Sequence, residues 1–421
     1  MANANLSAAK AAKNDEFYTE LPEIQAELKH YKDKFAGKTV FCNCDDPFES
    51  NFVKYFLMNF NGLGLKELIA TGYKTSPVQG TELGEKGKPY ALRVTETKSY
   101  LRGTQTDLDI AGAKQFLEKE QARVMIPLEG NWAKDEFGNI LQIAVKEEYV
   151  DEKTGKTKKR TVKQDLYYEA GDFRSDMSIE LLQQADIVVT NPPFSLFREY
   201  VAQLMQYGKQ FLIMGNVNAI TYKEFFPLLK DNKVWAGFHF NKTQMFVMPD
   251  DYERYDHIDS KGRKIGKVPA ITWFTNIDHA KRHQMLPLDL GFTYTGHEED
   301  YPKYDNYDAI NVDKVSQIPC DYMGVMGVPI TFLDKYCPEQ FEILGMLQSS
   351  TDEQAGIPNL RYYDDFVEMR QDMSLTGSRG SKANGNPVVA GKSKLGNFLF
   401  CKKQVSLFIR FMQEWLFVES E

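Results

Sequence analysis

The strongest constraint on the fold is an alternation of short apolar runs with segments of helical periodicity. Residues 39–42 and 65–71 have the composition of strands, and residues 48–60 between them place apolar side chains at helical spacing. The same alternation resumes at residue 172 and continues to residue 276. Alternating strands and helices are typical of a parallel sheet covered by helices on both faces. The sequence therefore predicts an α/β fold with a doubly wound, Rossmann-like core.

The alternation is interrupted between Thr71 and Asp172. One crossover needs only about 30 residues, so this stretch is too long to be a single connection. It holds two β-rich segments, 141–150 and 160–169, on either side of a turn at 152–156. We predict that residues 84–168, approximately, form an insertion with a hairpin. Residues 1–276 then form one domain, and 277–421 a less regular C-terminal region, with one helix predicted at 338–347.

Composition narrows the class of protein. The chain has 421 residues, 42% of them hydrophobic, and a net charge of −8. No uninterrupted run reaches the roughly 18 apolar residues of a membrane helix, and the N-terminus has no apolar segment typical of a signal peptide. The five cysteines are scattered, which favours a reducing, cytoplasmic location. The six histidines lack metal-ligand spacing, so we expect no metal and no membrane association.

The positive charge is concentrated in two segments. Residues 373–413 contain no acidic residue and carry seven cations: Arg379, Lys382, Lys392, Lys394, Lys402, Lys403 and Arg410. A second basic patch on the predicted hairpin comprises Lys153, Lys156, Lys158, Lys159, Arg160 and Lys163. Both suit contacts with nucleic-acid phosphates. A solvated tail and a merely solubilising hairpin are the alternatives.

The sequence Asn191-Pro192-Pro193-Phe194 follows directly after the predicted strand 186–190. Ligands bind at the carboxyl ends of strands in open α/β sheets. An aromatic amine is a weak nucleophile because its lone pair is delocalised into the ring. The Asn191 amide oxygen and the Pro192 carbonyl can each accept one of its N–H bonds, while Phe194 stacks on the ring. The alternative is a rigid turn with Phe194 in the core.

Two further segments suit a nucleoside cofactor. Asp172 can accept a hydrogen bond from the amino group of an adenine, and Phe173 can cover its ring; the alternative is a helix cap beside a core phenylalanine. We expect this pair at the end of a strand next to the one that precedes Asn191. Residues Asn43, Cys44, Asp45 and Asp46 follow the first strand, where they can hold a ribose or an amino-acid group. There the alternative is a pair of small strand residues with Asp46 as a helix cap.

These segments, together with DEFYT, SNFVKYF, NVNAITYKEF, YPKYDNYDAINV and MGVPITFL, resemble the adenine-specific (N6) DNA methyltransferases, and more narrowly the EcoRI-type family. The resemblance implies a Rossmann-like methyltransferase core, S-adenosylmethionine as methyl donor and a flipped-out adenine of double-stranded DNA as acceptor. It implies that 1–276 is the catalytic domain and 277–421 recognises the target. It also implies that Tyr18 and Thr19 border the methionine end of the cofactor. Because such an enzyme must methylate only one strand of a hemimethylated site, we expect a monomer to suffice, and a dimer stays open.

The sequence departs from the family pattern at two places. Asn43 to Asp46 replace the usual glycine-rich loop, and Thr71-Gly72-Tyr73 stand where a ribose-binding acid is usual. For DNA we expect contacts from Arg379, Lys382, Lys392 and Lys394, and an aromatic wall for the flipped base from Phe246 or Trp273. Two rival functions stay open at this stage: methylation of a protein glutamine by the same Asn-Pro-Pro-Phe site, and a DNA-binding relative without activity.

Overall fold

The computed structural model describes residues 18–48, 50–72, 89–101, 105–150, 156–248, 253, 255–260, 262–305, 307–346, 388–390, 392–393 and 398–403. The chain packs into two compact units. The first unit comprises residues 1–215 and 244–269, and the second comprises 216–243 and 270–421. These units are divided at residues other than the predicted boundary at 276, and the assignment of a catalytic domain and a target-recognition region stays a prediction.

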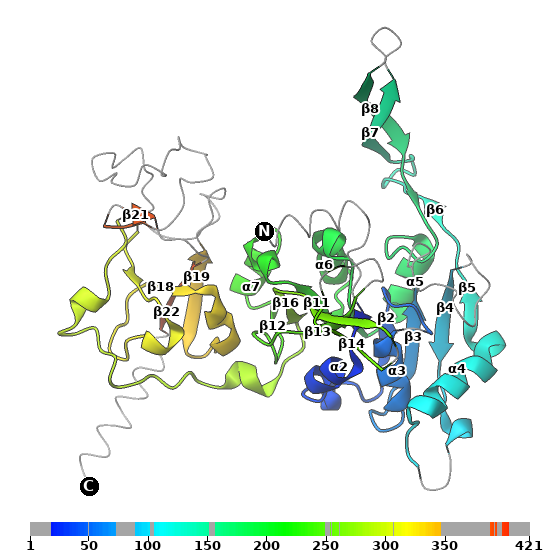
Figure 1. The fold of residues 1–421 in the computed structure, drawn as a ribbon, viewed down its shortest axis with the longest axis horizontal. Helices are drawn as coiled ribbons and strands as arrows, with labels where there is room; N and C mark the ends of the chain where they lie inside the picture. Colours follow the sequence, from blue (N-terminus) through cyan, green and yellow to red (C-terminus); the bar gives the residue numbers. More distant parts are fainter. Residues whose placement is uncertain are drawn as a thin grey trace. The chain divides into compact units, whose positions relative to one another are not determined.

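The first unit is organised around a mixed sheet in which six strands lie side by side in the order β11-β10-β2-β3-β4-β5 (Figure 1). These strands are β2 (Thr39–Cys42), β3 (Glu67–Thr71), β4 (Tyr90–Val94), β5 (Met125–Pro127), β10 (Ile187–Thr190) and β11 (Gln210–Asn216). The strands β11, β10, β2 and β3 are mutually parallel, whereas β4 and β5 are antiparallel to their neighbours. Part of the predicted insertion therefore extends this sheet.

The parallel strands are short and mostly apolar, and apart from the two ends of β11 their residues are buried. Val40, Phe41, Leu68, Ile69 and Val188 have no exposed surface. Strands covered on both faces have this composition because neither face meets water. In Figure 1 the helices α2, α3 and α4 lie on one side of the strands, and α5 and α6 lie on the other.

The described helices of the first unit include the one that the sequence predicts within residues 48–60. They are α2 (Leu21–Leu28), α3 (Asn51–Met58), α4 (Ile110–Val124), α5 (Asp176–Gln184) and α6 (Phe197–Gln206). Ser50 begins α3, with its hydroxyl accepting hydrogen bonds from the N–H groups of Phe52 and Val53, and Ser175 begins α5 in the same way. Asp46, the cap considered in the sequence, instead accepts a hydrogen bond of 3.0 Å from the N–H of Phe48.

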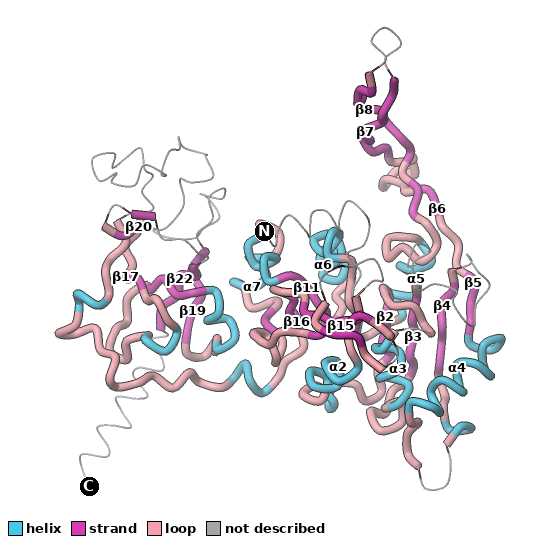
Figure 2. The backbone as a smooth tube through the Cα atoms, in the orientation of Figure 1, coloured by secondary structure: helices cyan, strands magenta, loops and turns pink. Residues whose placement is uncertain are grey.

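Smaller sheets complete the first unit. A four-stranded sheet has the order β1-β13-β15-β14, and two-stranded sheets pair β6 with β9 and β7 with β8. The strands are β1 (Tyr18–Thr19), β6 (Asn131–Trp132), β7 (Gln142–Val150), β8 (Thr157–Asp165), β9 (Tyr167–Tyr168), β13 (Met245–Val247), β14 (His257–Ile258) and β15 (Lys264–Lys267). Figure 2 shows β7 and β8 as a ribbon that stands clear of the large sheet.

Among the described residues, the second unit contains α7 (Phe226–Lys230) and eight strands, with β20 and β21 paired on their own. The strands are β12 (Trp235–Ala236), β16 (Ile271–Thr275), β17 (Ile310–Asn311), β18 (Met326–Pro329), β19 (Phe341–Met346), β20 (Val388–Val389), β21 (Lys392–Ser393) and β22 (Phe398–Lys403), the last of which completes a sheet in the order β17-β18-β22-β19. Strands β12 and β16 pair antiparallel, so the prediction of parallel pairing is wrong here.

The predicted helix at 338–347 is also wrong, because strand β19 occupies 341–346. Phe341 and Ile343 are buried on one side while Glu342 between them is exposed, and this alternation fits a strand. Within the described ranges, no helix is long and apolar enough to cross a membrane, and no group of three or more His, Cys, Asp or Glu residues is arranged to hold a metal ion.

Candidate active site

Two of the predicted site segments, 43–46 and 191–194, meet at one edge of the large sheet, next to the residues that follow β3. Strands β2, β3 and β10 are parallel, so the residues that follow Cys42, Thr71 and Thr190 emerge side by side. Sequence spacing predicted neighbouring strand ends for Asp172 and Asn191, whereas the registers place the segments after β2 and β10 side by side.

Asp45 connects the loop after β2 to the loop after β10 by hydrogen bonds. Its carboxylate accepts hydrogen bonds from the Thr190 hydroxyl, from the Ser50 hydroxyl at 2.9 Å and from the backbone N–H of Asn191. The Thr190 hydroxyl in turn accepts a bond of 3.2 Å from the N–H of Cys44. Burial raises the pKa of Asp45 to about 6 although these hydrogen bonds act in the opposite direction.

Asn43 is oriented by a tyrosine that the sequence analysis did not single out. Its side-chain oxygen accepts a hydrogen bond from the Tyr200 hydroxyl of α6, and its backbone carbonyl accepts one of 3.2 Å from Thr71. Asn43 is only 1% exposed, and its Nδ2 has no hydrogen-bond partner. A buried amide donor without a partner is costly unless a ligand accepts from it.

The Asn191-Pro192-Pro193-Phe194 segment joins β10 to a short 3-10 turn, Phe194–Leu196, before α6 begins at Phe197. Pro192 is buried, whereas the other three residues are partly exposed. Proline fixes φ at each of two successive positions, so the backbone carbonyls here have little freedom. The segment is therefore rigid and has surface that a substrate can reach.

Asp172 lies in a turn before α5, not at the end of a strand of the large sheet as predicted. It is 5% exposed, and Arg174 holds it in a two-pronged ion pair, with Nε 2.9 Å from Oδ1 and a terminal nitrogen 2.8 Å from Oδ2. Oδ1 also accepts the N–H of Arg174. Because a carboxylate oxygen has two lone pairs, Oδ2 retains capacity for one further donor.

Phe173 packs between two side chains. Its ring meets Tyr200 edge to face at 5.0 Å between centroids, and the Arg174 guanidinium lies 5.2 Å from its centroid. Tyr200 thus links Phe173 to Asn43, so the loop after β2 and the Asp172 turn share one support. The role of Phe173 in covering a cofactor ring stays a prediction.

Gly171, immediately before Asp172, has a φ of +81°, a conformation that a side chain makes unfavourable. Gly171→Ala is expected to cost roughly 1–2 kcal/mol of stability and to displace Asp172, which would weaken cofactor binding. Gly138→Ala is a matched control, because Gly138 has a φ of +84° in an open turn with no atom within 4 Å of an added Cβ. Calorimetric binding and thermal unfolding of both variants separate the two effects. Equal cofactor affinity in the two variants would contradict this role of the turn.

Tyr18 and Thr19 form β1 and pair with Val247 and Phe246. The hydroxyl of Thr19 donates to the Met214 sulfur of β11 at 3.0 Å, and its carbonyl accepts from Asn51 of α3 at 2.8 Å. The strand is thus fixed against elements that flank the sheet edge where the other segments meet.

The first unit has a cleft of about 350 Å³, lined by Pro89, Leu128, Glu129, Gly130, Tyr167, Glu169 and Ala170. Pro89 precedes β4, whose first residues lie beside the carboxyl end of β3. The cleft therefore belongs to the same edge of the sheet, and Glu129 and Glu169 bring carboxylates to it.

The comparison with known families decides the class of this site. The family model for the adenine-specific methyltransferase EcoRI matches residues 5–387. The chain belongs to this family. It is 43% identical to the Type II methyltransferase M.EcoRI of Escherichia coli over 346 residues, which is 81% of this chain and 89% of the relative. It is 36% identical to the Type II methyltransferase M.MpnI of Mycoplasma pneumoniae over 344 residues, 80% of this chain and 84% of the relative. No solved structure is significantly similar.

The resemblance found in the sequence is thus confirmed, and the protein is an adenine-specific DNA methyltransferase. The structure does not support the two aromatic residues that were predicted to contact the flipped base. Phe246 is fully buried in β13, and Trp273 is fully buried in β16, so neither offers a ring face to a base. We correct both expectations, because these side chains belong to the core.

The basic C-terminal segment of this methyltransferase is only partly described. Arg379, Lys382 and Lys394 lie outside the described residues, and Lys392 is in β21 with its side chain not described. Two other cations of the segment serve the fold. Lys403 is buried and donates to the carbonyls of Pro319 and Cys320 at 2.6 and 2.8 Å, and Lys402 pairs with Glu342 at 3.2 Å.

Sequence reasoning missed Thr190, Tyr200 and Arg174. Tyr200 had a detectable signal, because it falls on the apolar face of a helix between Phe197 and Val201, where a buried hydroxyl needs a partner. Thr190 had none, since its partner Asp45 comes from another loop. Arg174 had none either, since its ion pair with Asp172 depends on the conformation of the turn that the two residues share.

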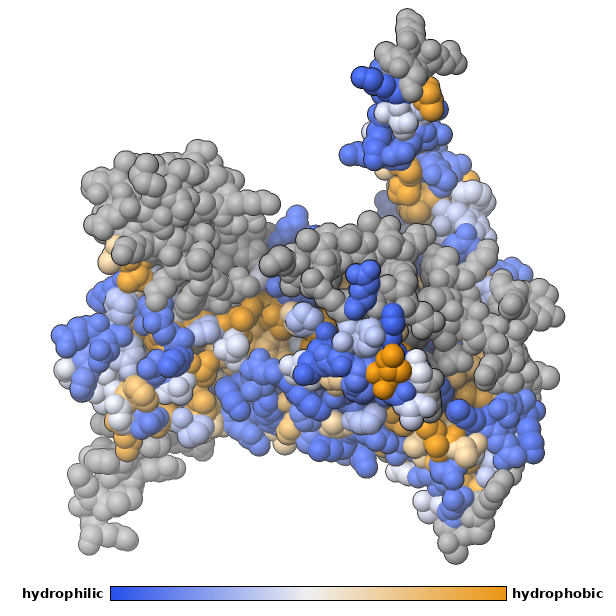
Figure 3. Space-filling view, in the orientation of Figure 1, coloured by the Kyte–Doolittle hydropathy of each residue, from blue (hydrophilic) through white to orange (hydrophobic). Residues whose placement is uncertain are grey.

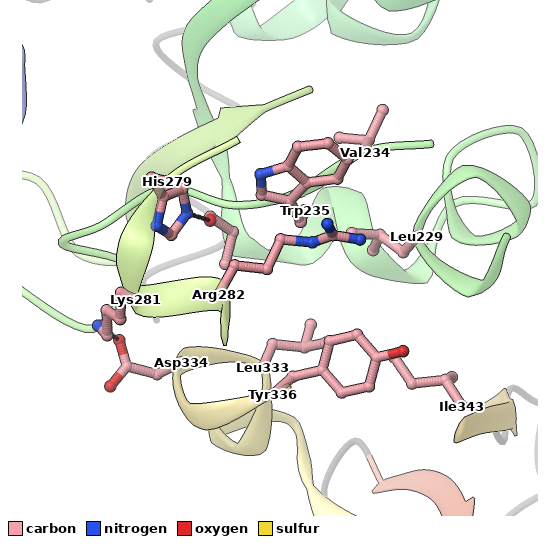
Figure 4. A pocket seen from close by; sticks show the side chains of 12 residues that line it. Leu229, Val234, Trp235, His279, Lys281, Arg282, Leu333, Asp334, Tyr336 and Ile343 are labelled. Carbon is pink, nitrogen blue, oxygen red and sulfur yellow. Dashed lines mark hydrogen bonds and ion pairs between the residues drawn. The ribbon is translucent and has the colours of Figure 1, made fainter. Parts of the chain in front are cut away.

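The second unit has a small cavity that is not part of the candidate site, and charged side chains are among those that line it (Figure 4). The Arg282 guanidinium lies 3.9 Å from the centre of the Trp235 ring, and the Lys281 ammonium contacts Asp334 at 2.6 Å. His279 bonds the carbonyl of Ala236 at 3.0 Å. These contacts hold neighbouring turns together, and we assign the cavity no catalytic role.

Breaking the Lys281–Asp334 pair is expected to destabilise the protein, because the two side chains are only 17% and 11% exposed. Asp334→Asn should lower the free energy of unfolding by about 3 kcal/mol, since it leaves Lys281 largely buried without its counter-ion. Asp231→Asn, which breaks the exposed Lys233–Asp231 pair, should change it by less than about 1 kcal/mol. Denaturant titration of both variants measures the difference. Equal losses would show that burial of the pair is unimportant.

Proposed function

We propose that this methyltransferase transfers a methyl group from S-adenosylmethionine to N6 of an adenine flipped out of duplex DNA. The observation that carries the proposal is the junction of the Asn191–Phe194 segment with the loop after β2 through Asp45 and Thr190. This junction puts a segment suited to an aromatic amine beside segments suited to a cofactor.

The residues present fit the cofactor. The partnerless Nδ2 of Asn43 can donate to its carboxylate, and Oδ2 of Asp172 can accept from its adenine amino group. Glu129 and Glu169 offer carboxylates for the ribose hydroxyls, for which the sequence has no acid after β3. Tyr18 and Thr19, with Cys44 to Asp46, would enclose the methionine end. When bound, S-adenosylmethionine supplies an electrophilic methyl group.

The catalytic role belongs to the segment after β10. The Asn191 amide oxygen and the Pro192 carbonyl accept the two N–H bonds of the adenine amino group, which moves its lone pair out of conjugation and toward the methyl carbon. Phe194 stacks on the base. Asp45 and Thr190 keep the segment in position, so that proximity and fixed dipoles supply the rate enhancement. The displaced proton passes to solvent from an acidic ammonium.

The test is methyl transfer from labelled S-adenosylmethionine to duplex DNA of mixed sequence, followed by digestion to nucleosides. We expect the label in N6-methyladenine. Label in another nucleoside, or in protein added as an alternative acceptor, would contradict the proposal.

A further inference from the structure

The β7–β8 ribbon is a long structural element with no partner in the described part of the chain. Its strands pair over nine residues each, from Gln142 opposite Asp165 to Val150 opposite Thr157. All but two of the eighteen strand residues are exposed. A two-stranded sheet is marginal in water by itself, so an element of this kind is better explained by a surface that it binds than by its own stability.

The ribbon is positively charged although the whole chain is acidic. Residues 142–150 and 156–165 carry six Lys or Arg side chains and three Asp or Glu side chains. The ion pairs Lys159–Glu148 and Arg160–Glu147, both at 2.9 Å, use two of the three acids. Lys146, Lys156 and Lys163 form no ion pair with any described residue. Figure 3 shows hydrophilic side chains over most of this element.

The base of the ribbon is fixed to the active-site edge of the sheet. The chain leaves β5 at Pro127, beside Tyr90, and returns through β9 to the Asp172 turn. The Arg174 guanidinium lies 4.9 Å from the ring centroid of Tyr168, and the N–H of Asp176 donates to the Asn131 side chain at 2.9 Å. DNA held with an adenine at Asn191 therefore passes the side of the molecule from which the ribbon rises.

The length and width of the β7–β8 ribbon suit a DNA duplex. Nine strand residues extend about 30 Å, close to the roughly 34 Å of one DNA turn, and a two-stranded ribbon fits the major groove. We propose that the β7–β8 ribbon is a DNA-binding arm, which contacts phosphates of the duplex beside the methylated site through Lys146, Lys156 and Lys163. The proposal rests on the proposed action on a flipped adenine in duplex DNA.

The first test is a Lys146→Gln, Lys156→Gln, Lys163→Gln triple variant of the full chain. Each lost phosphate contact should reduce the slope of log affinity against log salt by about 0.9, and DNA affinity near 0.1 M salt should fall on the order of tenfold. The control is Lys98→Gln, Lys114→Gln, Lys119→Gln, which removes the same charge from exposed positions elsewhere in the first unit. Equal slopes in the two variants would overturn the proposal.

A second variant removes the ribbon without disturbing its base. The N–H of Leu166 already donates to the carbonyl of Leu141 at 2.8 Å, which is the bond that a two-residue turn closes. Residues 142–165 are therefore replaced by Asn-Gly. We expect unchanged S-adenosylmethionine affinity, DNA affinity at least as weak as in the triple variant, and a smaller salt slope. If this variant keeps full DNA affinity, or changes only in oligomeric state, the proposal that the ribbon is a DNA-binding arm is overturned. Intact Asn191-dependent methylation in that case would leave the catalytic proposal standing.

Discussion

Asn191→Ala is expected to reduce the rate constant of methyl transfer by roughly 10²–10³-fold or more, with little change in S-adenosylmethionine affinity. The amide oxygen is one of only two acceptors proposed to draw the adenine amino group toward tetrahedral geometry, and interactions of this kind are worth several kcal/mol in the transition state. Single-turnover methylation with saturating DNA measures the effect.

The conservative variant Asn191→Asp gives the control. It retains an acceptor oxygen in the same place, so it should be less damaging than alanine even though it adds a charge near Asp45. If Asn191→Ala keeps more than a tenth of the wild-type rate, Asn191 does not have the proposed role in the mechanism. Loss of cofactor affinity in parallel would assign it to binding instead.

Asp45 is expected to make stability and activity respond to pH in opposite directions. Its folded-state pKa of about 6 lies above the ordinary 3.8, so the folded protein holds this proton more tightly than the unfolded chain. The stabilisation by the proton is therefore full below about pH 4 and is lost as the pH rises through 6. Above that, burial of the carboxylate costs about 3 kcal/mol.

Activity should follow the ionised form. The carboxylate accepts from Thr190, Ser50 and the N–H of Asn191, and protonation converts one of its oxygens into a donor. The wild-type rate constant is expected to fall about tenfold per pH unit below 6, as the catalytic segment loses an acceptor.

Asp45→Asn tests both effects together. The stability of the variant relative to wild type should increase by up to about 3 kcal/mol between pH 4 and pH 7, while its methyl-transfer rate is low and loses the step near pH 6. Denaturant titrations across this range and single-turnover rates supply the two profiles. If the stability difference does not vary with pH, Asp45 titrates normally and the argument fails.

The candidate site shows how far sequence reasoning reached. Asn191 and Asp45 could be found because each follows a short apolar run, and parallel strands bring such residues to one edge. The prediction for Asp172 was wrong about its local structure: we predicted the end of a strand, and the residue lies in a turn before α5. The error arose because residues 166–173 are apolar and aromatic enough to resemble a strand. The prediction that Phe246 contacts the flipped base was wrong because an aromatic residue type does not indicate whether the side chain faces a ligand or the core.

The sequence by itself determined the family, the parallel strands β2, β3, β10 and β11, and the segments that we propose as the site. These depend on local patterns of apolar residues and on short motifs. Only the tertiary structure decided that Asp45 lies against Thr190, that Tyr200 orients Asn43, that Arg174 holds Asp172, and that Lys403 is buried. The first two contacts join residues that are far apart in the sequence, and the other two depend on how a turn and a strand pack in the folded chain. No local sequence pattern encodes such contacts.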